Sequence, residues 1–286
     1  TLFPYTTLFR SEILQKELRK YKVALISGGR SVEHEISLKS MQATLSHTRP
    51  YYQFSHFTIS KEGEWFLDQE RLSFAQAVEE LKKCEVCFPL LHGPFGEDGA
   101  LQGFLETLQI PYVGPTFREA PVLMDKAWTK RMALTVGIQV ADFLEFSSFI
   151  WEKEKERCLN QIVTTLSFPL YVKAVHLGSS VGVFCVKNVE ELKKAIEQVI
   201  DLDNKFIVEQ KIEGREIEFA ILGNHQITIS EPGEVPKTED IYTYEEKYGK
   251  AALTLIACTN IKEEIKQRGK ELVAKLWSLF GCKGFA

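Results

Sequence analysis

The sequence predicts an α/β protein whose N-terminal part contains a doubly wound parallel sheet. Short apolar runs bounded by turn residues alternate with helical patterns, beginning with the run 23–26. The clearest helical pattern places Leu101, Phe104, Leu105 and Leu108 on one face. This alternation is typical of parallel strands joined by crossover helices. Ligands bind such sheets beyond the carboxyl ends of the strands, which is where Gly28-Gly29 and His92-Gly93 fall.

The predicted elements follow one another along the chain. The N-terminal part has strands at 23–26, 54–59 and 86–91, with helices at 33–45, 74–81 and 101–108. The later part has an α+β pattern, with helices at 124–136, 190–200 and 261–280, an antiparallel hairpin of strands 168–174 and 182–186, and strands at 206–209 and 217–222. The polar, tyrosine-rich stretch 231–250 predicts a long loop, and long loops often act as lids.

Composition excludes several classes of protein. The 286 residues are 44% hydrophobic and 26% charged, which is ordinary for a globular protein of about two domains. A disordered tail, a collagen-like repeat and a coiled-coil rod are thereby excluded. The net charge of −4 provides no basic excess for nucleic acid or an anionic membrane. Apolar stretches such as 251–258 are too short to cross a bilayer.

The chain start and the cysteines indicate no special chemistry. Residues 1–11 lack the features of a secretory signal, and we interpret residues 1–21 as a leader or linker not native to the fold. Cys84 and Cys87 form a C-x-x-C, but on a strand they would point to opposite faces. We therefore expect buried thiols in a reducing cytoplasm rather than a disulfide framework or a metal site.

The hairpin after Lys173 is the strongest candidate for chemistry. The turn Gly178-Ser179-Ser180-Val181-Gly182 would let backbone N–H groups approach phosphates, and a lysine on the preceding strand could neutralise a phosphate oxygen. An ordinary glycine-serine hairpin beside a surface lysine explains the same residues equally well. No Walker A loop and no G-x-G-x-x-G fingerprint occurs in the sequence.

Several acidic residues and histidines are also candidates. Glu209 ends an apolar strand. Glu216 and Glu218 share one face of a strand, where they could accept hydrogen bonds from ribose hydroxyls or simply be solvated. Glu33 opens a helix, where it could hold a substrate ammonium or merely interact favourably with the helix dipole.

The two histidines near the predicted sheet edge receive different interpretations. His34 is expected at the surface. His92 directly follows a buried strand, which favours a place at the ligand-binding edge of the sheet.

The order of five motifs resembles the D-alanine–D-alanine ligases, a family of ATP-grasp enzymes. The resemblance runs from about residue 22 to residue 286. It rests on Gly28–Ser37 (GGRSVEHEIS), Leu91–Gly103 (LHGPFGEDGALQG), Met124-Asp125-Lys126, Gly178–Gly182 (GSSVG) and Tyr244–Tyr248 (YEEKY). It implies a substrate-binding domain at 22–114, a central ATP-grasp lobe at 115–209 and an incomplete C-terminal lobe at 210–286.

The resemblance also implies roles for individual residues. Phosphates would be contacted by Lys126, Lys173, Lys247 and the backbone of Ser179, Ser180 and Val181. The adenine pocket would be formed by Glu209, Gln210 and Ile212, and the ribose would be held by Glu216. The first D-alanine would be bound by Glu33 and His92, and Ser179 and Tyr248 would join Glu33 in a catalytic hydrogen-bonded group.

The implied reaction is ATP-dependent ligation of two D-alanines through a D-alanyl phosphate, for peptidoglycan synthesis in the cytoplasm. Tyr248 favours the dipeptide over a D-alanine–D-lactate ester. A D-alanine–D-lactate ligase or another ATP-grasp carboxylate ligase is the alternative activity. The family's Mg²⁺ ligands are expected beyond Ala286, so a nucleotide-binding fragment without catalysis is a further alternative. We also expect a homodimer and a fusion to an upstream cell-wall ligase, with no nucleic-acid or membrane partner.

Overall fold

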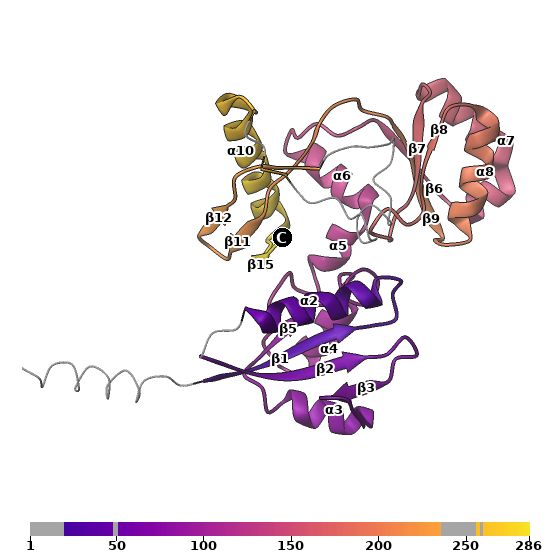
Figure 1. Ribbon diagram of the computed structural model, residues 1–286. Coiled ribbons are helices and arrows are strands. Elements are labelled where there is room, and N and C mark those ends of the chain that lie inside the picture. Colours follow the sequence, from indigo (N-terminus) through magenta and orange to yellow (C-terminus); the bar gives the residue numbers. More distant parts are fainter. Residues whose placement is uncertain (1–19, 48–50, 236–255, 258–259) are drawn as a thin grey trace, which may run out of the picture. The chain divides into compact units, whose positions relative to one another are not determined.

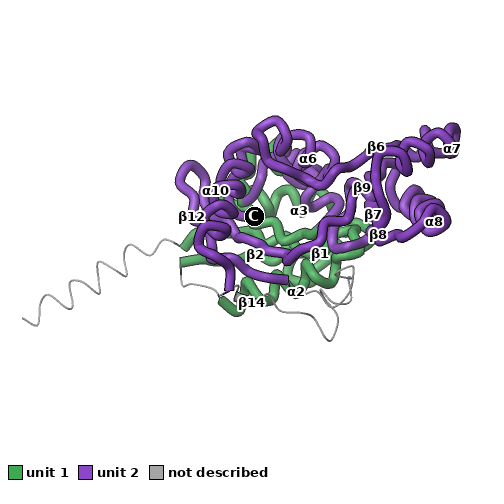
Figure 2. Tube along the Cα trace, turned by 90° about the horizontal axis from the view of Figure 1, so that it is seen from above, with its two compact units in different colours: residues 1–92, 104–113 green, residues 93–103, 114–286 purple. Residues whose placement is uncertain are grey.

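The computed structural model describes residues 20–47, 51–235, 256–257 and 260–286. The chain forms two compact units, coloured separately in Figure 2. Unit 1 contains residues 1–92 and 104–113, and unit 2 contains residues 93–103 and 114–286. The finer boundaries predicted at 115 and 210 stay predictions.

Unit 1 is built on a five-stranded sheet in the order β4-β3-β2-β1-β5. Strand β1 pairs in parallel with both β2 and β5, while β2, β3 and β4 form an antiparallel meander. The strands are β1 (Tyr21–Gly28), β2 (Tyr52–Ile59), β3 (Trp65–Leu67), β4 (Glu70–Leu72) and β5 (Val86–Pro89). The predicted parallel sheet is therefore present, with an antiparallel extension that the sequence did not indicate.

Helices cover both faces of this sheet, as expected for a doubly wound arrangement. Figure 1 shows α2 (His34–Ser46) on one face and α3 (Phe74–Leu81) on the other. The ring of Phe104, from α4 (Ala100–Thr107), packs against Trp65 and Phe74 on the α3 side. Helix α3 begins where predicted because Ser73 and Gln76 form a reciprocal capping box.

Unit 2 contains a four-stranded antiparallel sheet in the order β6-β9-β7-β8. Its strands are β6 (Phe143–Ser147), β7 (Leu170–Ala174), β8 (Val183–Val186) and β9 (Lys205–Gln210). One face packs on α7 (Ser148–Thr165) and α8 (Val189–Ile200), which lie side by side in Figure 1. Fully buried Trp151, Leu170, Ile196 and Phe206 belong to the core between these layers.

The other described residues of unit 2 after residue 114 form short sheets and the helices α5 (Ala120–Met124), α6 (Lys126–Thr135) and α10 (Glu263–Phe280). Helices α5 and α6 meet at Asp125, and α10 ends at Gly281 in the left-handed conformation. The short strands are β10 (Glu216–Glu218), β11 (Ile221–Gly223), β12 (Ile227–Ile229), β13 (Gly233–Val235), β14 (Ile256–Ala257) and β15 (Gly284–Phe285). They form the sheets β10-β13-β14 and β12-β11-β15.

Three details differ from the sequence predictions. The strand predicted at 217–222 is two strands, separated at 219–220. Residues 233–235 of the predicted loop form a strand, and residues 236–250 lie outside the described part of the chain. The helix α7 and the strands β6 and β12 were not predicted.

Candidate functional site

The face of the four-stranded sheet opposite α7 and α8 carries charged side chains. Along β7, Leu170, Val172 and Ala174 are buried in the helix-side core, so Tyr171 and Lys173 point to the other face. The same alternation along β9 places Lys205 and Glu209 on that other face. The N-terminal part of α6 packs there through Ala127, which belongs to a small apolar cluster with Val175 and Ile207. This charged face is the candidate site.

Glu209 lies between two lysines on this face. Its carboxylate forms ion pairs with Lys173 and, at 2.8 Å, with Lys130 Nζ. Burial tends to raise the pKa of the Glu209 carboxyl, but the charges of Lys173 and Lys130 outweigh burial and hold the pKa below its ordinary value. Glu209 is therefore a buried anion that holds two cations beside it.

Lys126 stands at the start of α6, immediately after the helix cap. Asp125 caps the helix by accepting a 2.8 Å hydrogen bond from the backbone N–H of Trp128. The indole of Trp128 is exposed. The ammonium of Lys126 donates to the carbonyl of Leu177 and, at 3.4 Å, to that of Val175. Burial, reinforced by the nearby charge of Lys173, lowers the pKa of Lys126 to about 8.

The loop between β7 and β8 adopts an uncommon backbone conformation. Ser179 and Ser180 both have positive φ values, of 49° and 62°, which few non-glycine residues adopt. Gly182 also has a positive φ, and a Cβ there would come within 2.9 Å of the Cβ of Ala174. Such backbone strain is concentrated at ligand-binding sites, so this geometry supports the interpretation of the loop as a phosphate cradle.

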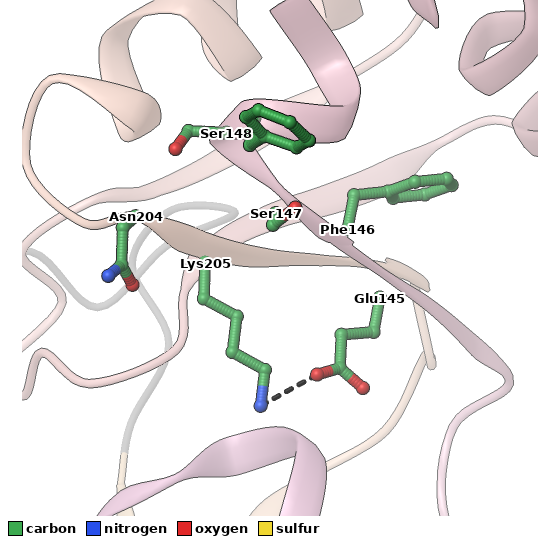
Figure 3. A pocket seen from close by; sticks show the side chains of 7 residues that line it. Glu145, Phe146, Ser147, Ser148, Asn204 and Lys205 are labelled. Atoms are coloured by element: carbon green, nitrogen blue, oxygen red, sulfur yellow. Dashed lines mark ion pairs between the residues drawn. The ribbon is translucent and has the colours of Figure 1, made fainter.

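A second group of charges joins the base of this loop to the sheet. Asp125 Oδ2 lies 2.8 Å from Lys205 Nζ and 3.3 Å from His176 Nε2. On its other side, His176 Nδ1 lies 3.0 Å from Asp203 Oδ1. Lys205 Nζ also pairs with Glu145 at 2.6 Å, as Figure 3 shows.

The Lys205–Glu145 pair borders a pocket of about 360 Å³ at the edge strand β6. Ser147, Ser148 and Asn204 also line it (Figure 3). None of the residues predicted for the site lines this pocket, so we do not assign it to the nucleotide.

Unit 1 holds the residues predicted to bind the first D-alanine. Glu33 caps α2 without a side-chain capping bond and is only 4% exposed. Ser31 Oγ donates to the His92 carbonyl at 2.7 Å, and Ser40 Oγ lies 3.0 Å from His92 Nε2. Glu33 and His92 are thus held in one unit, Glu33 at the start of α2 and His92 after β5.

His34 is not the surface residue that the sequence indicated. It is buried, and its Nδ1 donates to the carbonyl of Gly29 at 2.7 Å. The helix begins so close to the end of β1 that the first-turn imidazole folds back on the preceding turn. Its role is to brace this turn.

The remaining predicted residues differ in how far their side chains are exposed. The Gln210 side chain is engaged with the Ser167 backbone at 2.7 and 3.0 Å. Ile212 is 62% exposed, and Glu216 and Glu218 are both exposed on one face of β10, as their spacing predicted. Lys247 and Tyr248 lie outside the described residues.

The structure adds four charged residues that the sequence analysis did not select. Lys130 follows Lys126 by four positions on α6, and Lys205 precedes Glu209 by four positions on β9. These spacings were visible signals, because both place the pair on one face. Asp203 and His176, by contrast, are joined only by the fold.

The described residues include no group of three or more His, Cys, Asp or Glu side chains that could hold a metal ion. They also include no helix long and apolar enough to cross a membrane. Five cysteines lie in the described part of the chain as free thiols, and Cys84 and Cys87 are buried, as expected. Burial raises the pKa of the Cys87 thiol to about 12, which makes it unreactive.

Comparison with known families decides the ancestry of the chain. A model described as the D-ala D-ala ligase N-terminus matches residues 22–79 and 68–115, and one described as the D-ala D-ala ligase C-terminus matches residues 132–286. The chain belongs to the D-alanine–D-alanine ligase family. The resemblance found in the sequence motifs is therefore confirmed, and with it the ATP-grasp fold class of these ligases.

Individual relatives of this chain support the same family assignment. A D-alanine–D-alanine ligase of Chlorobaculum tepidum is 35% identical over 94% of this chain and 83% of its own length. A bifunctional enzyme MurC/Ddl of Chlamydia caviae is 37% identical over 94% of this chain, which spans only 35% of that relative.

Solved structures agree in fold with this chain. The VanG D-Ala:D-Ser ligase of Enterococcus faecalis superimposes with a TM-score of 0.81 at 28% identity, covering 93% of this chain and 84% of that one. The D-alanine–D-alanine ligase of Coxiella burnetii gives a TM-score of 0.75 at 29% identity, with 94% and 79% covered.

Proposed function

We propose that this protein ligates two D-alanines at the expense of ATP, through a D-alanyl phosphate, to supply the dipeptide for peptidoglycan. The observation that carries the proposal is the clustering of Lys126 and Lys173 with the loop 178–182 on one face of a sheet. Family membership supplies the substrate class.

The proposed chemistry follows from these side chains. A carboxylate is a poor electrophile, so ATP must first transfer its terminal phosphoryl group to the carboxylate of the first D-alanine. Lys126, Lys173 and the loop N–H groups would spread the negative charge that develops during this transfer. The amine of the second D-alanine would then attack the acyl phosphate carbon and displace phosphate.

Glu209 would be the counterion of Lys173 until the nucleotide binds. The Lys173 ammonium pairs with Glu209 in the structure, and Lys130 provides a second counterion for the same carboxylate. When Lys173 turns to a phosphate, Lys130 would keep the Glu209 charge balanced. Glu209 would then border the adenine with Gln210 and Ile212, and Glu216 would hold the ribose.

The first D-alanine would be held by unit 1. The buried Glu33 would pair with the substrate ammonium, and His92, oriented by Ser40, would face its carboxylate side. Ser179 and Tyr248 would join Glu33 in a hydrogen-bonded group, and Lys247 would reach the transferred phosphate.

Mg²⁺ is the metal that phosphoryl transfer in this family implies. The described residues offer no matching ligand group, and we assign no step to the metal. Its ligands beyond Ala286 stay a proposal, as do the homodimer and the cytoplasmic location. The match to the bifunctional MurC/Ddl relative supports the further proposal of an upstream fusion, which sequencing the reading frame before residue 1 would test.

The proposed function is tested by coupled measurement of ADP release with D-alanine, ATP and Mg²⁺. Because the Mg²⁺ ligands are proposed to lie beyond Ala286, we expect D-alanine-dependent release from the protein extended past residue 286 and little release from residues 1–286 alone. D-Lactate should replace the second D-alanine poorly. D-Serine belongs in the same series because a structural neighbour is a D-Ala:D-Ser ligase. No binding of ATP by the chain would contradict the proposal.

The substrate side of the site is tested by Glu33→Gln. Because the amide cannot neutralise an ammonium, we expect the KM for the first D-alanine to rise at least about tenfold. The Kd for ATP should stay unchanged, since no ATP role is proposed for Glu33. A variant that lost ATP binding and kept its D-alanine KM would place Glu33 in the wrong subsite.

A further inference from the structure

The imidazole of His176 lies between two carboxylates. Its Nδ1 is 3.0 Å from Asp203 Oδ1, and its Nε2 is 3.3 Å from Asp125 Oδ2. Both carboxylates are nearly buried, with side chains 6% and 9% exposed, whereas the imidazole is 43% exposed. The backbone N–H of His176 also donates to Asp203, at 2.7 Å.

The two carboxylates on either side of the ring favour the imidazolium, in which both nitrogens carry a proton. An ionised carboxylate can accept hydrogen bonds but cannot donate them, and a neutral imidazole has a single N–H. The Nδ1 contact with Asp203 is a hydrogen bond, whereas the Nε2 contact with Asp125 is an ion pair that exists only when His176 is the imidazolium. The other charged groups around it are Lys205, which pairs with Asp125 from β9, and Lys126 on α6.

His176 also sits where the loop is tied to the start of α6. The neighbouring residues Val175 and Leu177 both accept from the Lys126 ammonium, and Val175 also accepts from the Lys126 backbone N–H at 3.3 Å. Three consecutive loop residues are thus connected to Asp125 and Lys126. The strained residues Ser179 and Ser180 follow after Gly178.

We propose that the protonated imidazole of His176 is a positioning residue, which holds Lys126 and the loop 178–182 in the arrangement that receives the phosphates of ATP. This inference rests on the proposed nucleotide site. His176 itself contacts no phosphate in this scheme. Loss of its proton breaks one of the two links, so that the loop and Lys126 lose part of their alignment and ATP binds more weakly.

The test is the Kd for ATP of the wild-type chain and of His176→Gln, measured by titration calorimetry from about pH 5.5 to about pH 9. The ratio of the two Kd values cancels the ionisation of ATP and of Lys126, which both proteins share. We expect the variant to bind roughly three- to tenfold more weakly at low pH, where the wild-type imidazolium is paired with both carboxylates. The ratio should fall toward one as the imidazole loses its proton.

Asp203→Asn provides a second variant, because it removes the charge of the acceptor and leaves the imidazole in place. It should weaken ATP binding with the same pH trend. The double variant should be no worse than His176→Gln alone, because that change already removes the contact that Asp203→Asn weakens. His225→Gln is the matched control, since His225 is exposed in the turn between β11 and β12, and its ratio to wild type should be one at every pH.

The outcomes separate this inference from the proposed function. A wild-type chain that does not bind ATP overturns both. A wild type that binds ATP, with a His176→Gln ratio that is one throughout or does not vary with pH, overturns the positioning role alone. Thermal melts by circular dichroism accompany each variant, and loss of folding in both His176→Gln and Asp203→Asn would show a purely structural pair and also overturn the role.

Discussion

Burial sets the chemistry of Lys126. Its pKa falls from the ordinary 10.5 to about 8, because the ammonium is desolvated beside Lys173. A bound phosphate would stabilise the ammonium form of Lys126, so the site favours the binding of an anion. The same environment makes Lys126 sensitive to pH in the range where a lysine in water would not respond.

We therefore expect the affinity for ATP to fall as the pH rises through about 8, where Lys126 loses its proton. The stability of the unliganded chain should respond in the opposite direction. Between about 8 and 10.5 the unfolded state holds the proton more tightly, so the contribution of Lys126 to the free energy of unfolding rises with pH. Calorimetric ATP titrations and urea melts of wild type and Lys126→Met at two pH values check both signs. A pH trend that is the same in both proteins would exclude Lys126 as its source.

Glu209 offers a second prediction for a single residue. In Glu209→Gln the amide cannot balance Lys130 and Lys173, and we expect the free energy of unfolding at neutral pH to fall by about 2 kcal/mol. The pKa of Glu209 is lowered, so the carboxylate's contribution is present above its ordinary pKa of 4.5 and disappears as the pH falls. The two proteins should become equally stable in acid.

The control for this change is Glu197→Gln, which breaks an exposed pair with Lys155. It should cost less than about 1 kcal/mol, because solvent screens an exposed ion pair. Equal losses in the two variants, measured by urea melts at neutral pH, would show that burial does not strengthen the Glu209 cluster.

Single residues also show how far the sequence informs the site. Lys126, Lys173 and Glu209 were selected from motifs, and the structure brings their side chains to one charged face. His176 could not be paired with Asp203 in advance, because the two residues are 27 positions apart and come together only when β7 and β9 lie side by side. His34 was misjudged because its burial depends on the turn at the end of β1.

At the scale of elements, the hairpin β7–β8 depends on the glycine at its second strand. In Gly182→Ala the new Cβ would both occupy a left-handed backbone and meet Ala174 at 2.9 Å. We expect a loss of at least about 2 kcal/mol in the free energy of unfolding, with weaker ATP binding.

Gly137→Ala, after α6, is the control that separates the backbone cost of Gly182→Ala from the cost of its contact with Ala174. Gly137 also has a positive φ, of 74°, but a Cβ there would have no atom within 4 Å. It should lose only about 1 kcal/mol, the conformational part alone, with ATP affinity unchanged. Similar losses in both glycine variants, measured by urea melts, would remove the contact with Ala174 as the cause.

Element prediction succeeded where periodicity and end signals coincide. Helix α3 was placed to the residue, since its capping box and apolar face mark both ends. Helix α7 was missed because Glu152–Arg157 is a run of six charged residues that resembles a solvated segment, and a kink at Glu154 interrupts it. Strands β3 and β4, of three residues each, are too short to produce an alternating pattern.

At the scale of the whole molecule, the division of labour between the units is testable. The proposed ATP contacts all lie in unit 2, whereas Glu33 and His92 lie in unit 1. With ATP alone, hydrogen exchange followed by mass spectrometry should show protection in peptides covering 125–130, 170–182 and 205–210. Peptides covering β1 and β2 should exchange unchanged until D-alanine is added. Early protection of β1 with ATP alone would contradict this separation.

The exposed indole of Trp128 has a practical consequence. More than half of its surface is exposed, and it lies two positions after Lys126 on the same first turn of α6. Its emission should therefore respond when a nucleotide rearranges that turn, whereas the emission of Trp151, enclosed in the core, should not. The protein thus carries its own optical reporter, which can be recorded in a stopped-flow instrument without attaching any dye.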